Sequence, residues 1–382
     1  MKHLKSIFFL SGTAIGSGLI SLPIILAAWG TWGAIALILC FAVVTYFSAL
    51  ARCELNIQTQ ATYTLKQVGL CFSGKKTALL GDLCLKLLCF TLLTAYLHGL
   101  NTLLATDLCS KIWIVGLLFI LLLLPTNLTL GFNKLCFYGL VILITKVILS
   151  FIGQVDLSIM PGIMPNGIAT LELMIPTLFT AFGFQGSLHS LTKFCENNPN
   201  LIRKSCFWGC VITAVIYSLW TLTLNAFLFQ NMPEQFRKIL INPDRCQDIM
   251  KALMHFGGFE ISCISCLTII TSIVGVGISL MDDLCENLGI KLNFSQKKSL
   301  CTMIIVIPTA VFANTFTQAF VKILSFAGCI LAIIAIFIPL FLLNKAKKPF
   351  VFSELNCKWC LCLLILFGSC VVLSECLHVF QR

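Results

Sequence analysis

The stretch "SGTAIGSGLISLP", residues 11–23, interrupts a hydrophobic segment that is otherwise long enough to cross a membrane. Gly12, Gly16 and Gly18 stand close together in it, and Pro23 follows just beyond them. Glycine is among the weakest helix formers, and proline lacks the backbone N–H group that a helix needs. A segment that served only as an anchor would be expected to use leucine here. The stretch therefore predicts a broken transmembrane helix.

The composition places this stretch in a membrane protein. Of the 382 residues, 58% are hydrophobic and 11% are charged, and the mean hydropathy is +0.98. Soluble domains carry about 25% charged residues, so a water-soluble chain of this length could not bury so much apolar surface. The first apolar run continues through residues 21–28 without a signal-peptidase pattern, so it is expected to remain in the mature protein.

The spacing of apolar segments predicts an all-α integral membrane protein with eleven transmembrane helices. Each segment has about 20 residues, the length that a helix needs to cross the hydrocarbon core. The connections are too short for a soluble catalytic domain, so residues 1–382 are expected to form a single membrane domain. The segments are expected at residues 7–28, 33–51, 78–105, 113–131, 136–154, 170–190, 206–229, 252–281, 299–315, 319–343 and 359–378.

The basic residues predict the orientation of the chain. With the N-terminus in the cytoplasm, most of the 26 Lys and Arg residues fall on the inner side, as the positive-inside rule requires. The net charge of +11 then indicates membrane orientation and not nucleic-acid binding. We expect a multi-pass protein of the inner (cytoplasmic) membrane with a periplasmic C-terminus. Within the third segment, Lys86 is expected to pair with Asp82, one turn earlier.

Lys146 stands in the middle of the fifth predicted segment, in "GLVILITKVILSF". A charge at that depth in a bilayer is costly and marks a functional site by default. Two interpretations stay open: an ion-coupling residue with an exchangeable proton, and a structural lysine bonded to carbonyls at a helix end. The first interpretation predicts that Lys146→Ala abolishes pH-driven accumulation of substrate.

A second weak helix lies at residues 174–191, "MIPTLFTAFGFQGSLHSL", which contains Pro176, Gly183 and Gly186. It falls five segments after the first, so it runs through the membrane in the opposite direction. Paired interruptions in two inverted halves point to a transporter site near the bilayer midplane. We expect inverted repeats and an accessory helix at residues 7–154, 170–343 and 359–378, respectively.

The two interruptions also predict the chemistry of the ligand. An unwound stretch exposes backbone N–H and C=O groups, which a membrane tolerates only where they face a cavity. Helix N-termini are positive and suit a carboxylate, whereas freed carbonyls suit an ammonium group. An amino acid zwitterion carries both groups, so the sequence predicts an amino acid carrier.

The motifs "GTAIGSGLISLP", "PTLFTAFGFQGS" and "TSIVGVGISLMDDL" (271–284) resemble the hydroxy and aromatic amino acid permease family, over nearly the whole chain. The likeness is greatest to tyrosine-specific transport proteins, including those of chlamydial type. The resemblance implies a core of five plus five inverted helices and proton-driven uptake of tryptophan, tyrosine or phenylalanine. It implies no enzymatic activity, no cofactor and no metal.

The resemblance also implies a binding site. The backbone amides of Gly16, Ser17 and Gly18 would bind the substrate carboxylate, and the carbonyls of Ala14 and Ile15 would bind its ammonium group. The facing wall would be formed by Phe182, Gly183, Phe184, Gln185 and Gly186, with a phenylalanine ring stacked on the substrate. The family often has histidine where this chain has Gln185, which puts a proton role there in doubt.

Other positions complete the predicted site. The candidates for a hydrogen-bond partner of a substrate hydroxyl group are Gln185, Tyr96 and His98, and the sequence does not rank them. Sodium-coupled relatives hold their ion with hydroxyls between helices one and eight, where this chain has Thr271 and Ser272. Some proton-coupled relatives carry a lysine on helix five beside that place. Lys146 fits this description, so proton coupling is favoured over sodium coupling.

Several features have plainer interpretations. Gly12 and Gly16 have the spacing of close helix packing, and Thr271 and Ser272 suit ordinary interhelical hydrogen bonds. The near-match "GLCFSGKK", residues 69–76, lacks the Ser or Thr that a P-loop places on magnesium. A channel is less favoured, because it would be built from symmetric rings of charges or carbonyls.

The sequence thus predicts a secondary active transporter that imports aromatic amino acids, with tyrosine favoured, by proton symport with alternating access. A carrier for tryptophan, phenylalanine or another neutral amino acid, sodium-coupled or exchanging, is the alternative. The expected partners are the aromatic amino acid, a coupling proton and the lipid bilayer, and the oligomeric state stays open.

Overall fold

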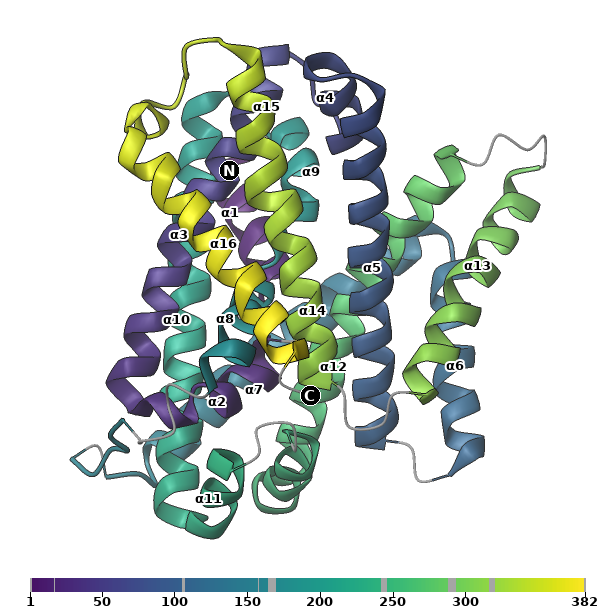
Figure 1. Cartoon of the computed structure of the whole chain (residues 1–382). Coiled ribbons are helices and arrows are strands. Elements are labelled where there is room, and N and C mark those ends of the chain that lie inside the picture. Colours follow the sequence, from purple (N-terminus) through teal and green to yellow (C-terminus); the bar gives the residue numbers. More distant parts are fainter. Residues whose placement is uncertain are drawn as a thin grey trace.

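The computed structural model of the chain describes residues 2–16, 18–104, 107–156, 158–163, 170–241, 246–287, 293–315 and 320–380. These residues form helices joined by loops and contain no β-strand, which confirms the predicted all-α class. The long helices form one bundle, with the short helices α4 and α9 toward one end and α11 at the other (Figure 1).

The helices follow one another along the chain. The first part contains α1 (Lys2–Ala14), α2 (Gly18–Ile25), η1 (Ala27–Trp29), α3 (Gly30–Thr59), α4 (Leu65–Phe72), α5 (Lys75–Leu104), α6 (Leu108–Leu123) and α7 (Thr126–Ile152). The second part contains α8 (Leu171–Ala181), η3 (Phe184–Ser187), α9 (Leu188–Phe194), α10 (Pro199–Asn231), α11 (Pro233–Ile241), α12 (Cys246–Asn287), α13 (Phe294–Thr315), α14 (Phe320–Ala332), η5 (Ile333–Phe337), α15 (Ile338–Ala346), η6 (Ser353–Asn356) and α16 (Lys358–Phe380).

The lengths of these helices are those of a multi-pass membrane protein. Eight helices in the described part of the chain are long and apolar enough to cross a membrane, and the bent pair α1 and α2 makes a ninth. α6 is shorter, with 16 residues, and α8 and α9 are short pieces of the sixth predicted segment. The predicted number of eleven spans is therefore not reached by helix length alone.

The predicted bounds of the fourth and fifth spans are wrong. The sequence pattern predicts spans at 113–131 and 136–154, but α6 ends at Leu123 and α7 already begins at Thr126. Pro125 explains the difference, because proline disfavours the helical conformation in the residue before it. Leu124 accordingly has a ψ angle of 147°. The continuous apolar run on both sides hides this break from a hydropathy profile.

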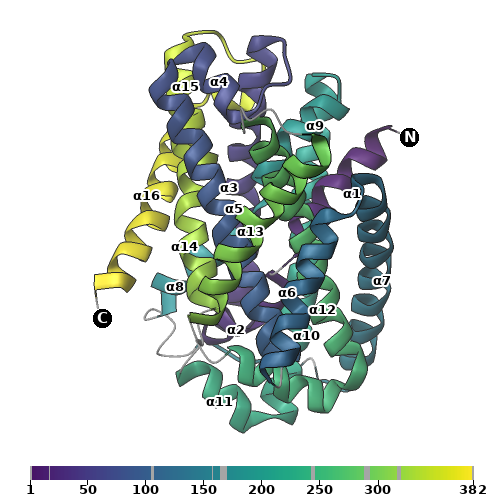
Figure 2. The ribbon, with the colours of Figure 1, turned by 90° about the vertical axis from the view of Figure 1, so that its right-hand side faces the viewer.

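Two groups of helices pack on different sides of the bundle. α6 and α13 lie together at one edge and both pack on α5 (Figures 1 and 2). On another side, α16 covers α14 and α8, and the buried Glu375 carboxyl group of α16 accepts a hydrogen bond from Ser325 of α14. The accessory C-terminal helix is thus part of the packed bundle.

Pro23 changes how a backbone carbonyl of α2 is hydrogen-bonded. Because proline has no N–H group, the carbonyl of Leu19, four residues earlier, loses its helical hydrogen-bond donor. The indole Nε1 of Trp220 on α10 donates to this carbonyl at 2.6 Å. Both side chains are at most 1% exposed, so the indole stabilises a buried carbonyl that the helix itself leaves without a partner.

We expect Trp220→Phe to destabilise the protein, because it leaves the Leu19 carbonyl buried without a donor. The cost of such a group is about 1–3 kcal/mol, and the smaller ring adds a packing loss. The thermal midpoint in detergent should therefore fall relative to wild type. Trp208→Phe is the matched control, since Trp208 lies on the same helix but is 47% exposed. Equal midpoints for the two variants would contradict this account.

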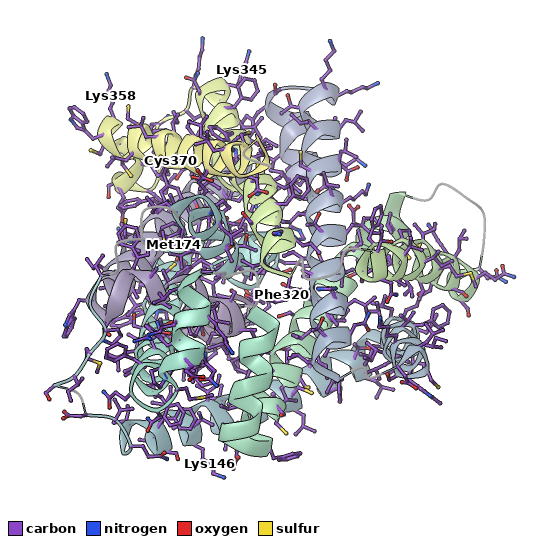
Figure 3. All side chains as sticks on the ribbon, turned by 60° about the horizontal axis from the view of Figure 1, so that its bottom comes forward. Lys146, Met174, Phe320, Lys345, Lys358 and Cys370 are labelled. Carbon is purple, nitrogen blue, oxygen red and sulfur yellow. The ribbon has the colours of Figure 1, made fainter. Side chains whose placement is uncertain are left out.

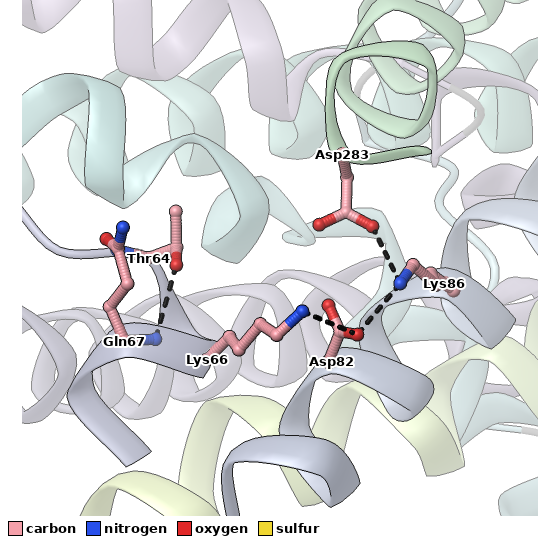
Figure 4. A network of polar contacts seen from close by, with 6 residues as sticks. All are labelled: Thr64, Lys66, Gln67, Asp82, Lys86 and Asp283. Atoms are coloured by element: carbon pink, nitrogen blue, oxygen red, sulfur yellow. Dashed lines mark hydrogen bonds and ion pairs between the residues drawn. The ribbon is translucent and has the colours of Figure 1, made fainter. Parts of the chain in front are cut away.

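At the end of the bundle that holds α4, four charged side chains join three helices (Figure 4). The Nζ atom of Lys86 lies 2.8 Å from Asp82, as the sequence predicts, and 3.2 Å from Asp283 of α12. Lys66 of α4 approaches Asp82 at 3.5 Å. Thr64 caps α4 by accepting from the Gln67 amide. The network ties α4 to α5 and α12.

Candidate transport site

The two predicted helix breaks exist, and they meet. α1 ends at Ala14 and α2 begins at Gly18, with the two axes bent by 58°. α8 ends at Ala181, and η3 and α9 continue beyond Gly183. A β-carbon built on Gly18 would lie only 2.7 Å from the Cβ atom of Ala181. The absence of a side chain at Gly18 therefore allows the broken ends to come into contact.

The hydroxyl group of Tyr217, on α10, lies between these ends. It is 2.7 Å from the carbonyl oxygen of Ala14 and 2.9 Å from that of Ala181. The side chain is fully buried, and its Oη atom would lie 2.6 Å from a β-carbon at Gly18. Sequence analysis missed Tyr217. The available signal was a hydroxyl-bearing aromatic residue inside an apolar span, which hydropathy counts treat as ordinary core.

The directions of the broken helices determine which polar backbone groups face the meeting point. α1 and α8 both end at this meeting point, so their carbonyl ends, which carry partial negative charge, come together there. α2 and η3 both begin beside it, with the amide of Leu19 donating to the Gly16 carbonyl at 3.0 Å and that of Phe184 to the Phe182 carbonyl at 2.8 Å. The arrangement gathers carbonyl oxygens, the acceptors that suit an ammonium group, at the meeting point. Ser17, one of the predicted carboxylate ligands, lies outside the described residues.

Gly16 lies against the predicted ion-site residues of α12. A β-carbon on Gly16 would be 2.6 Å from the Oγ atom of Ser272. The hydroxyls of Ser272 and Thr271 both donate to the carbonyl of Thr268, at 2.9 and 3.0 Å. Their oxygen lone pairs remain available as acceptors. The structure therefore brings the first helix break and the α12 hydroxyls together, as the sequence predicts.

The residues of the second break divide into buried and open ones. Phe182 is fully buried and packs edge-to-face on Tyr217, with 5.5 Å between ring centroids. Phe184 is also buried, at 1% exposure. Gly183 lies tightly over the Thr180 carbonyl, whereas Gly186 is exposed and borders open space. Only Phe182 of the two rings packs on Tyr217, at the meeting point of the helix ends.

Gln185 has a more specific position than the sequence indicates. Its side-chain Nε2 donates to the Oγ atom of Ser48 on α3, at 2.7 Å. Its Oε1 atom is buried and has no hydrogen-bond partner in the structure. Such an acceptor costs about 1–3 kcal/mol when unsatisfied. A donor from a bound substrate or a water molecule would relieve that cost.

Tyr96 and His98 both lie on α5 and are about 6% exposed. The Nδ1 atom of His98 is 3.1 Å from the carbonyl of Ala313 on α13. His98 is thus turned toward α13. Tyr96 belongs to the same buried core as Tyr217 and Phe182.

Lys146 occupies a different place from the helix breaks. It lies six residues before α7 ends at Ile152, about 9 Å along the helix axis, and so is nearer to an end than the sequence indicates. Its Nζ atom pairs with Glu260 of α12 at 2.7 Å, and the lysine side chain is 64% exposed at the edge of the bundle (Figure 3). Glu260 precedes Thr271 by about 16 Å along α12. The coupling role of Lys146 stays a prediction.

Exchanging the two charges distinguishes a structural ion pair of Lys146 from a role of Lys146 in ion coupling. We expect Lys146→Glu or Glu260→Lys alone to lower the yield of folded protein, because each places like charges side by side across α7 and α12. The double variant Lys146→Glu/Glu260→Lys should restore the yield, since the ion pair is rebuilt in reverse, and pH-driven uptake by this variant would show that the lysine itself is not needed for coupling. Restored folding without pH-driven uptake would instead favour a role of Lys146 itself in coupling.

Two interrupted membrane helices that meet through their broken ends are typical of a secondary transporter. The model of the tryptophan/tyrosine permease family matches residues 1–375. The chain therefore belongs to the tryptophan/tyrosine permease family, which contains transport proteins and not enzymes.

Proteins of known name support this assignment. The chain is 26% identical to tyrosine-specific transport system 1 of Haemophilus influenzae, over 91% of this chain and 89% of that protein. It is 24% identical to the low affinity tryptophan permease of Escherichia coli K12, over 98% and 95%. It is also 24% identical to glutamine transporter 2 of Aliivibrio fischeri, over 98% and 99%.

A solved structure supports the fold. The crystal structure of the Eremococcus coleocola manganese transporter, in complex with an aromatic bis-isothiourea substituted compound, matches 97% of this chain and 84% of that chain. The TM-score is 0.58 and the sequence identity is 13%. At this identity the likeness concerns the fold of a membrane transporter.

Proposed function

We propose that the protein imports an aromatic amino acid, with tyrosine as the favoured substrate, by proton symport with alternating access. The observation that carries this proposal is the pair of carbonyls at the ends of α1 and α8, Ala14 and Ala181, which one hydroxyl group bridges at 2.7 and 2.9 Å. The Ala14 carbonyl would receive the substrate ammonium group. The amide groups of the first break, next to the start of α2, would receive the carboxylate.

The proposed substrate class follows from the family and from the surroundings of the site. Phe182 supplies aromatic surface beside the helix ends, and aromatic rings stack favourably on one another. The unsatisfied Oε1 atom of Gln185 would accept the hydroxyl group of a bound tyrosine. A carrier for tryptophan or for another neutral amino acid is the alternative, because such proteins are among the relatives.

The proposed coupling uses the membrane potential. A proton that moves inward with a zwitterion carries one net positive charge, worth about 2.3 kcal/mol per 100 mV. The proposed halves of the carrier are α1–α7 and η1 on one side and α8–α15 on the other, related as inverted repeats. In the proposed orientation, the N-terminus lies in the cytoplasm and the C-terminus in the periplasm of a cell with an inner membrane.

Uptake into proteoliposomes tests this function. Tyrosine uptake should saturate, should be inhibited by tryptophan and phenylalanine, and should rise when the outside is made more acidic than the inside, with or without sodium. A requirement for sodium with no effect of the pH gradient would favour the sodium-coupled alternative. Flux that rises linearly with concentration would indicate a channel, and inhibition by glutamine but not by aromatic amino acids would overturn the substrate class.

A further inference from the structure

The Tyr217 hydroxyl group lies near more hydrogen-bond acceptors than it can donate to at one time. A phenol has one hydrogen to donate, yet two carbonyl oxygens lie within 2.9 Å of it, Ala14 at the end of α1 and Ala181 at the end of α8. The site is fully buried, so bulk water does not supply the missing donor. One of the two carbonyls is therefore always incompletely satisfied by this hydroxyl.

Its position is fixed by packing on every side. Phe182 meets the ring edge-to-face at an interplanar angle of 86°, and the backbone of Gly18 lies directly against the hydroxyl. One turn further along α10, Trp220 holds α2 through the Leu19 carbonyl. The phenol cannot swing away without disturbing α2 and α8, so its hydrogen can only turn from one carbonyl to the other.

We infer that Tyr217 is an internal competitor for the substrate ammonium group. This inference rests on the proposed function, which places the ammonium group at the Ala14 carbonyl. In the empty carrier, the hydroxyl hydrogen is shared between the two carbonyls. When an amino acid binds, its ammonium group donates to Ala14, and the hydroxyl hydrogen turns to Ala181. Tyr217 is thus a positioning residue that sets how tightly the carrier binds an α-amino group.

The inference predicts that Tyr217→Phe changes the binding of one ligand and leaves that of another unchanged. In Tyr217→Phe, both carbonyls of the empty carrier lack this donor, and an ammonium group becomes their best partner. L-Tyrosine should therefore bind roughly tenfold more tightly, the change that about 1.4 kcal/mol represents. The amino-less analogue 3-(4-hydroxyphenyl)propionate has no ammonium group, so its dissociation constant should stay unchanged. Tighter binding should also lower KM and slow release, so kcat should fall.

Equilibrium binding of both ligands to purified wild type and Tyr217→Phe measures this difference. Tyr138→Phe is the matched control, because Tyr138 is 55% exposed on α7 and should change neither constant. Equal changes for both ligands, or weaker binding of L-tyrosine alone, would overturn the inference. The proposed function fails separately: wild type would then bind the amino-less analogue as tightly as L-tyrosine, or would bind neither saturably.

A second variant keeps the test decisive if Tyr217→Phe does not fold. Replacement of Tyr217 by 3-fluorotyrosine keeps the ring and the hydroxyl group but makes the hydroxyl a stronger donor. The carbonyls of the empty carrier are then better satisfied, so L-tyrosine should bind more weakly while the amino-less analogue is unaffected. Tighter or unchanged binding of L-tyrosine in this variant would contradict competition.

Discussion

Gly18→Ala is expected to lower tyrosine uptake by about ten- to a hundredfold. The added β-carbon would lie 2.6 Å from the Tyr217 hydroxyl and 2.7 Å from the Ala181 side chain. Both neighbours are buried and cannot move aside without separating α2 from α8 and α10. Overpacking of this kind costs about 1–3 kcal/mol, and about 1.4 kcal/mol corresponds to a factor of ten.

Initial uptake rates, normalised to the amount of folded protein, measure this effect. Gly275→Ala is the matched control, because a β-carbon at Gly275 on α12 meets no atom within 4 Å. That variant should transport like wild type. Wild-type uptake by Gly18→Ala would show that close contact between the two broken ends is not required for transport.

Gly328→Ala is expected to have the largest effect on stability. Gly328 of α14 lies against α8, where a β-carbon would be 2.1 Å from the Pro176 carbonyl oxygen and 2.8 Å from the Thr180 hydroxyl. That hydroxyl donates to the Leu324 carbonyl at 2.9 Å and so helps to hold α14 against α8. The alanine must force the two helices apart, which removes this bond and the packing around it.

The yield of monodisperse protein and its thermal midpoint in detergent measure the loss. Gly116→Ala on α6 is the control, since a β-carbon there meets no atom within 4 Å. We expect Gly328→Ala to lower the free energy of unfolding by more than the usual overpacking cost of about 1–3 kcal/mol. The reason is that backbone atoms, and not a flexible side chain, block the added methyl group. A midpoint equal to that of Gly116→Ala would disprove the tight α8–α14 contact.

Local sequence signals predicted the breaks in the two helices and the residues beside them. Glycine and proline weaken a helix wherever they occur, so the interruptions at Gly16 and Gly183 could be found without tertiary information. The likeness to a known family then placed Ser272 beside the first break, where the structure has it. The Lys86–Asp82 pair was equally predictable, because it depends only on helical spacing.

Features that depend on packing between distant segments were not predictable from one sequence. Tyr217 lies 203 residues from Ala14, and nothing near Tyr217 in the sequence distinguishes it from a core residue. The pairing of Lys146 with Glu260 depends on how α7 and α12 pack together, which hydropathy does not specify. The break at Pro125 was overlooked because apolar residues on both sides dominated the profile.

The two broken helices are unequal in how firmly their halves are held. Every residue of α2 is buried, and α8 is enclosed by α14 and α16. In contrast, α1 exposes Leu4, Phe8 and Thr13, and Gly186 borders open space beside it. Thermal fluctuations should therefore be concentrated in α1, so that water reaches the centre from its end with less reorganisation than from the opposite end. Amide hydrogen exchange in the resting carrier would then be fast in α1 and slow in α2 and α8.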